Sequence, residues 1–68
     1  MILMTYDEFR RRIENMQAQI KREGTGDPNE FANELGISRR TLFYDLERLR
    51  DEGAIIKFSR SRKTYYFA

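Results

Sequence analysis

Residues 31–53, FANELGISRRTLFYDLERLRDEG, decide the fold of this 68-residue chain. At the centre of the segment, Gly36, Ile37 and Ser38 place a helix stop, one apolar residue and a helix cap in direct succession. Glycine relieves the left-handed backbone strain found just past a helix end, and Ser38 can accept hydrogen bonds from the free N–H groups that open the next helix. Two helices joined by so short a turn form a helix-turn-helix unit, in which the second helix reads DNA in many proteins.

The two helices on either side of this turn can be bounded from their ends. The first is expected over about residues 28–35, with Asp27 as the cap acceptor and Pro28 at the first helical position. The second is expected over about residues 39–52, with Gly53 as its stop. Its buried side is marked by leucines that fall within a narrow arc of the helix: Leu42, Leu46 and Leu49.

A longer amphipathic helix is expected upstream, over about residues 6–23. Thr5 and Glu8 have the spacing of a capping box, and Met4 and Phe9 have that of a hydrophobic staple. Apolar residues that recur at helical spacing predict the core face of this helix: Phe9, Ile13, Met16 and Ile20.

The arginine cluster of this helix, Arg10, Arg11 and Arg12, lies off the apolar stripe. A solvated face balanced by nearby acids is the favoured interpretation, and contact with phosphate is the other. Gly24 is expected to stop the helix, and Thr25 begins a short link or a stub of strand.

Two strands are expected over residues 54–58 and 64–67, because both segments are rich in Ile, Phe and Tyr. Residues 59–63 contain neither Gly nor Asn, so the turn type and the register stay open, with a hairpin over about residues 54–67 as the simplest connection. An isolated hairpin is marginal in water. Apolar residues of both strands are therefore expected to close over the helices: Ile56, Phe58, Tyr65 and Phe67.

The composition fits one small domain over residues 1–68, near the lower limit for an independent core. The absence of Cys and His excludes disulfides, zinc sites and imidazole chemistry. So short a chain has little material for a pocket that excludes water, so no enzyme activity, cofactor, metal or small-molecule ligand is expected. The apolar start, residues 1–4, is too short for a signal peptide or a membrane span, which predicts a cytoplasmic protein.

The formal net charge is only +2, but it is unevenly distributed. Residues 1–37 hold seven acids and five bases, residues 38–52 hold four of each, and residues 53–68 hold four bases and no acid. Such an asymmetry indicates a polyanion at one end of the molecule.

The outward face of the second helix of the unit begins without a carboxylate and carries Arg39, Arg40, Thr41 and Tyr44. Solvated helices usually place acids in the first turn, where the helix dipole favours them. Two arginines there cost a few tenths of a kcal/mol, and contact with phosphate or bases gives a reason to retain them. Asp45 is expected to pair internally, for instance with an arginine of the first helix, and Arg48 with a neighbouring acid.

Three bases cluster in the predicted turn of the hairpin: Arg60, Arg62 and Lys63. Charges at such a place can simply keep a strand edge from aggregating. The absence of any nearby acid favours phosphate binding instead.

Residues 35–56, LGISRRTLFYDLERLRDEGAII, resemble the DNA-binding domains of DeoR-like bacterial regulators, and most closely the amino-terminal domains of regulators with a WYL ligand-sensing domain. Those domains share a Ser-Arg-Arg-Thr start, an Asp-Leu or Asp-Ile pair and a helix-ending Gly, matched here by Ser38, Arg39, Arg40, Thr41, Asp45, Leu46 and Gly53. The resemblance implies a winged helix-turn-helix, an α+β fold of three helices followed by a two-stranded β-hairpin wing. The chain departs from the family at Tyr44, where Arg is usual. A second departure is that no sensing domain follows the wing, and if this is the complete protein, ligand control within the chain is not expected.

In that family the recognition helix enters the major groove and the wing touches the flanking backbone or minor groove. The positions that match imply DNA contacts by Ser38, Arg39, Arg40 and Thr41. Bonding at the helix start explains Ser38 and Thr41 equally well.

The sequence therefore predicts sequence-specific binding of double-stranded DNA by a transcriptional regulator. Arg40, with Thr41 and Tyr44, would read the major groove, and phosphates would be held by Arg39, Arg60, Arg62 and Lys63. A protein–protein adaptor of the same fold stays open as the alternative. Specific reading usually needs two half-sites, so residues 1–4 and 65–67 either form a homodimer contact or finish the core.

Overall fold

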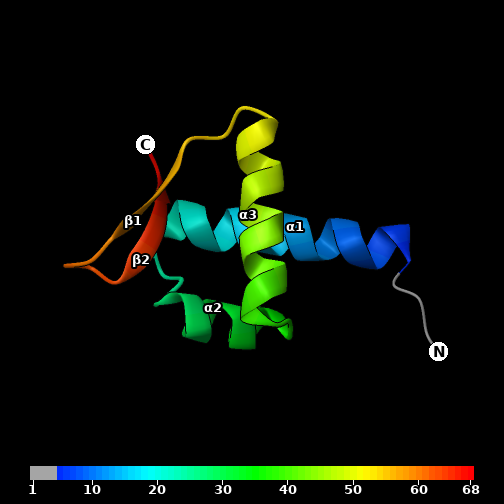
Figure 1. The fold of residues 1–68 in the computed structure, drawn as a ribbon, viewed down its shortest axis with the longest axis horizontal. Helices are drawn as coiled ribbons and strands as arrows, with labels where there is room; N and C mark the ends of the chain where they lie inside the picture. The colour runs from blue at the N-terminus through cyan, green and yellow to red at the C-terminus, as the bar shows by residue number, and fades with distance from the viewer. Residues whose placement is uncertain (1–4) are drawn as a thin grey trace.

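The computed structural model describes residues 5–68. Helices α1 (Tyr6–Arg22), α2 (Pro28–Leu35) and α3 (Arg39–Asp51) are followed by strands β1 (Ile56–Ser59) and β2 (Thr64–Phe67). Figure 1 shows α3 crossing in front of α1, α2 beside the N-terminal end of α3, and the hairpin projecting to one side. The expected α+β winged helix-turn-helix, three helices and then a two-stranded antiparallel hairpin, is confirmed for the described residues.

The tight turn between α2 and α3 forms as its residues predict. Gly36 is left-handed, with φ of 70°, and closes α2. Ser38 is the N-cap of α3, and its Oγ accepts from the Thr41 N–H at 3.1 Å. Ile37 is half-buried against the core, so the turn is anchored by one apolar side chain between two caps.

The starts of the other two helices are also fixed by local bonds. The Asp27 carboxylate accepts from the Glu30 N–H at 2.8 Å, and the Glu30 carboxylate accepts from the Asp27 N–H at 3.1 Å, a reciprocal capping box. At α1, the Thr5 hydroxyl accepts from the Glu8 N–H at 3.1 Å. The proposed staple involves Met4, which lies outside the described residues.

The end of α1 differs from the prediction by one residue. Glu23, and not Gly24, takes the left-handed conformation, with φ of 58°. Its N–H donates to the Ile20 carbonyl and the Gly24 N–H donates to the Gln19 carbonyl, the bond pattern of a Schellman motif. A side chain in this conformation costs roughly 1–2 kcal/mol, so the position of Glu23 calls for a compensating contact, which the hairpin supplies as described below.

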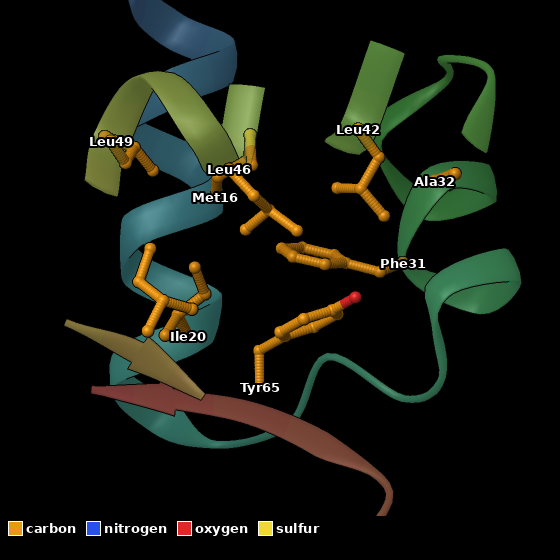
Figure 2. Packing of buried hydrophobic residues seen from close by; sticks show 9 residues of the cluster. Met16, Ile20, Phe31, Ala32, Leu42, Leu46, Leu49 and Tyr65 are labelled. Carbon is orange, nitrogen blue, oxygen red and sulfur yellow. The ribbon is translucent and has the colours of Figure 1, made fainter. Parts of the chain in front are cut away.

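One apolar core joins the three helices to the hairpin, and its buried members are Met16, Ile20, Phe31, Ala32, Leu42, Leu46, Leu49, Ile56 and Tyr65. Figure 2 shows the Phe31 ring at its centre, between the leucines of α3 and Tyr65 of the hairpin. The Phe31 and Tyr65 ring centroids are 5.9 Å apart. Two predicted core residues are not part of it: Phe67 is 38% exposed in the last pair of the strand ladder, and Phe9 is half-buried between two guanidinium groups.

The hairpin register, open from the sequence, pairs Ile56 with Phe67, Lys57 with Tyr66, Phe58 with Tyr65 and Ser59 with Thr64. Four residues, 60–63, therefore form the loop. Lys63 closes it in the left-handed conformation, with φ of 52°, and the Arg62 N–H donates to the Ser59 hydroxyl at 3.2 Å. Side-chain bonding to the backbone thus replaces the glycine usual in such turns.

The link after α1 fixes the hairpin to the helices. Thr25 is buried; its N–H donates to the Thr64 hydroxyl at 3.1 Å, and its own hydroxyl accepts from the Tyr65 N–H at 2.9 Å. The sheet of the described residues contains only β1 and β2, so Thr25 holds the hairpin through hydroxyl bonds and not as a strand. Within residues 5–68, none of the helices combines the length and apolar character needed to cross a membrane.

Candidate nucleic-acid interface

The exposed face of α3 pairs each of its first two arginines with an aromatic ring one turn further on. The Arg39 guanidinium carbon lies 5.4 Å from the centroid of the Phe43 ring, and that of Arg40 lies 5.6 Å from the centroid of the Tyr44 ring. Arg40 Nη2 also donates to the Tyr44 hydroxyl at 3.3 Å. Cation–π contacts of this kind hold a guanidinium in place without neutralising it.

No carboxylate among residues 5–68 forms an ion pair with Arg39 or Arg40. The acid on the same face of α3, Glu47, is engaged by Arg50, whose Nη1 lies 3.1 Å from Glu47 Oε1. Both N-terminal guanidinium groups therefore keep their charge, at the helix end where the dipole disfavours cations.

Ser38 and Thr41 are occupied by the helix start. The Ser38 hydroxyl donates to the Thr41 hydroxyl at 3.0 Å and accepts from the Thr41 N–H. Ser38 is exposed and Thr41 is half-buried. The capping role explains both residues in the structure as it stands, and contact with DNA by either of them stays a prediction.

Arg50 connects α3 to the hairpin. Its Nε and Nη2 donate to the Ile56 carbonyl at 3.2 and 2.8 Å. Burial raises the pKa of the Tyr65 hydroxyl, and the positive charges of Arg50 and Arg39 oppose that rise.

The three bases of the hairpin loop are not equivalent. Arg60 and Lys63 are exposed and make no ion pair or side-chain hydrogen bond with the described residues. Arg62 Nη1 instead donates to Glu23 at the end of α1, and its guanidinium carbon lies 5.4 Å from the centroid of the Tyr66 ring. One of the three predicted phosphate ligands is therefore neutralised by the protein's own carboxylate.

Asp45 is an internal partner, as predicted from the sequence. It is 5% exposed, and its Oδ2 lies 2.9 Å from Arg12 Nε, although the contact is poorly aligned for a hydrogen bond. Arg12 Nη2 donates to Asp45 Oδ1 at 3.4 Å. The interpretation of residues 10–12 as a solvated face is therefore wrong for Arg12, which joins α1 to α3, and Asp45 is not available to read bases.

Arg48 does not pair with a neighbouring acid as expected. Its guanidinium carbon lies 5.1 Å from the centroid of the Phe9 ring, which also carries the Arg12 guanidinium at 5.4 Å. Both guanidinium groups therefore contact the same α1 ring. This flank of α3 thus contacts α1 through the Phe9 ring.

A hollow of about 460 Å³ lies along the outward face of α3, lined by Arg39, Arg40, Phe43, Tyr44 and Glu47. Phe43 was not among the residues singled out from the sequence, because its angle places it at the edge of the core. The residues described by the structure gather no cluster of acids that could hold a metal ion.

Over residues 12–67 the chain matches the family described as HTH domain, and it therefore belongs to this winged helix-turn-helix family, which is found in DeoR- and WYL-type regulators. Membership implies DNA as the partner and a domain that is typically non-catalytic. No curated protein and no solved structure matches the chain.

Proposed function

We propose that the protein binds double-stranded DNA sequence-specifically and acts as a transcriptional regulator. In this proposal α3 enters the major groove, where Arg40 reads a guanine edge with help from Thr41 and Tyr44. Arg39 and the basic side chains of the hairpin loop hold flanking phosphates. Arginine bidentate to guanine is the commonest base-specific contact in protein–DNA complexes.

The observation that carries the proposal is the state of Arg39 and Arg40. Both are exposed at the start of α3, both are held over aromatic rings, and neither forms an ion pair with a carboxylate of the described residues. A helix start that keeps two cations against its own dipole is suited to an anionic partner. Arg60 and Lys63 add free positive charge on the loop that projects beside the helices (Figure 1).

The direct test is selection of bound duplexes from a random pool, followed by affinity measurements on the enriched site. We expect one enriched sequence, with a guanine at the position where the protein discriminates most strongly between bases. Arg40→Ala should lose roughly 1–3 kcal/mol of preference at one base pair, while binding to unrelated sequence falls by much less.

Arg11→Ala is the matched control, because Arg11 is exposed on α1 and its loss removes the same charge. This variant should keep the full preference. An unchanged preference in Arg40→Ala, or an equal loss in both variants, would remove Arg40 from the role of base reader.

A single unit of this size covers only a short half-site, so we propose that two copies bind together on a two-fold symmetric site. Of the surface nominated from the sequence, residues 1–4 lie outside the described residues and Tyr65 is buried, which leaves Tyr66 and Phe67. Gel-shift titration should show a second, cooperative complex on a full site and only one complex on a half-site.

A further inference from the structure

Two adjacent aromatic side chains stand on the outward face of the recognition helix. Phe43 is 39% exposed and Tyr44 is 62% exposed. Single exposed apolar residues need no explanation, but here two neighbours leave ring surface in water on the face that carries Arg39 and Arg40. The hollow that they line has a mostly apolar surface, and Arg39, Arg40 and Glu47 complete its lining.

The two rings have different chemistry available. The Tyr44 hydroxyl accepts from Arg40 Nη2, so this ring serves to position the Arg40 guanidinium. Phe43 has no polar atom, and Arg39 covers one side of its ring at 5.4 Å. The exposed remainder of the Phe43 ring is apolar surface, which is suited to an apolar contact.

The major-groove edges of DNA offer one such apolar group. Thymine displays a 5-methyl group there, while guanine displays the two acceptors that an arginine binds. We propose that Phe43 is a specificity-determining residue that contacts the 5-methyl group of a thymine next to the guanine bound by Arg40. This inference rests on the proposed DNA binding and adds a second base to what α3 reads.

The spacing along the helix agrees with neighbouring base pairs. Residues 40 and 43 are separated by about 4.5 Å along the axis, at roughly 1.5 Å per residue. Successive base pairs are about 3.4 Å apart. When α3 follows the groove, the two side chains therefore reach adjacent steps of the duplex.

The test replaces each thymine of the selected duplex in turn with deoxyuridine, which removes the methyl group and keeps the base pairing. At one position, adjacent to the guanine whose preference Arg40→Ala abolishes, the unchanged protein should bind about fourfold more weakly, the value for burying one methyl group. Phe43→Ala should bind the thymine and uracil duplexes equally at that position. Arg11→Ala, on the exposed face of α1, leaves Phe43 in place and should retain the fourfold ratio.

Each outcome is decisive. Equal binding of every thymine and uracil duplex by the unchanged protein overturns the methyl contact while DNA binding stands. Binding of no duplex at all refutes the DNA proposal itself. A thymine preference that persists in Phe43→Ala shows that another residue makes the methyl contact. If the preference is lost in Tyr44→Ala but kept in Phe43→Ala, that residue is Tyr44. Phe43→Gln, which keeps a long side chain suited to a helix, replaces Phe43→Ala if circular dichroism shows that variant to be unfolded.

Discussion

Asp45 lies inside the recognition helix but serves the fold. It is buried against Arg12 of α1, and the pair holds the crossing of the two helices seen in Figure 1. The side chains of Arg12 and Asp45 are 12% and 7% exposed, so neither charge can easily be solvated by water if its partner is removed. Removing one member of a buried pair is far more costly than replacing both with apolar residues.

Arg12→Met should therefore destabilise the protein by about 3–5 kcal/mol, which is comparable to the whole stability of about 3–5 kcal/mol that so small a core supplies. We expect this variant to be largely unfolded at room temperature by circular dichroism. The double variant Arg12→Met with Asp45→Leu should recover most of the stability in urea unfolding. A double variant no more stable than Arg12→Met would show that the pair is not the source of the loss.

Tyr65 makes the stability of the protein depend on pH at the alkaline end. Burial raises its pKa above the usual value, so the folded protein keeps the hydroxyl proton at pH values where the unfolded chain has lost it. The contribution of Tyr65 to the free energy of unfolding is therefore fully present below about pH 10, the pKa of Tyr in the unfolded chain. It declines as the pH rises through the pKa of Tyr65 in the folded protein. Urea unfolding should show that the free energy of unfolding falls less between pH 8 and pH 11 for Tyr65→Phe than for the unchanged protein. Equal losses in both proteins would contradict this account.

At the scale of elements, the hairpin is tied to the end of α1 by Glu23 and Arg62. Glu23 is left-handed at a position where glycine is usual, and its carboxylate accepts from the loop guanidinium. Arg62 must break its ion pair with this carboxylate before it can bind a phosphate. In the proposed complex, Glu23 would act against DNA binding by the loop, both as a competing partner for Arg62 and as a negative charge close to the phosphates.

Glu23→Gln should raise affinity for duplex DNA of any sequence, and it should steepen the salt dependence by up to about 0.9 in the slope of log K against log salt, the amount for one more phosphate neutralised. Glu14→Gln is the matched control, because Glu14 pairs with Arg10 at 3.7 Å on α1 and its loss changes the net charge equally. Affinity that rises equally in both variants would mean that net charge, and not release of Arg62, is responsible.

Features set by neighbours in the chain were predictable, and features set by distant partners were not. The caps at Ser38 and Asp27 follow from spacings of three residues, and both form as expected. The Glu23–Arg62 contact joins residues 39 apart in the sequence, and no local pattern indicates it. For Asp45, the sequence predicted a partner among the arginines of the first helix but not which one. The way α1 and α3 cross selects Arg12.

The candidate site was predicted in the same uneven way. The position of the helix start and the helical periodicity predicted that Arg39 and Arg40 lie on the outward face of α3, and both are exposed there. Phe43 was missed because angle alone cannot decide whether a residue at the edge of a core is buried. Arg62 could not be recognised as neutralised, because its partner lies at the far end of another element.

For the whole molecule, the cations that the proposal assigns to DNA lie on two elements, the start of α3 and the loop of the hairpin. Arg50 bonds α3 to the Ile56 carbonyl, and Thr25 bonds the loop end of the hairpin, at Thr64 and Tyr65, to the link after α1. The hairpin is therefore fixed relative to α3, and the loop cations Arg60 and Lys63 do not depend on a mobile arm.

The salt dependence of affinity for duplex DNA tests the central claim most directly. Three cations are assigned to phosphates without an internal competitor, Arg39, Arg60 and Lys63, so log K should fall linearly with log salt with a slope of about 2.7 or more. Replacing Arg60 and Lys63 with Ala should reduce that slope by about 1.8. Absence of duplex binding at low salt, or a slope near zero, would contradict the account and favour a protein–protein adaptor.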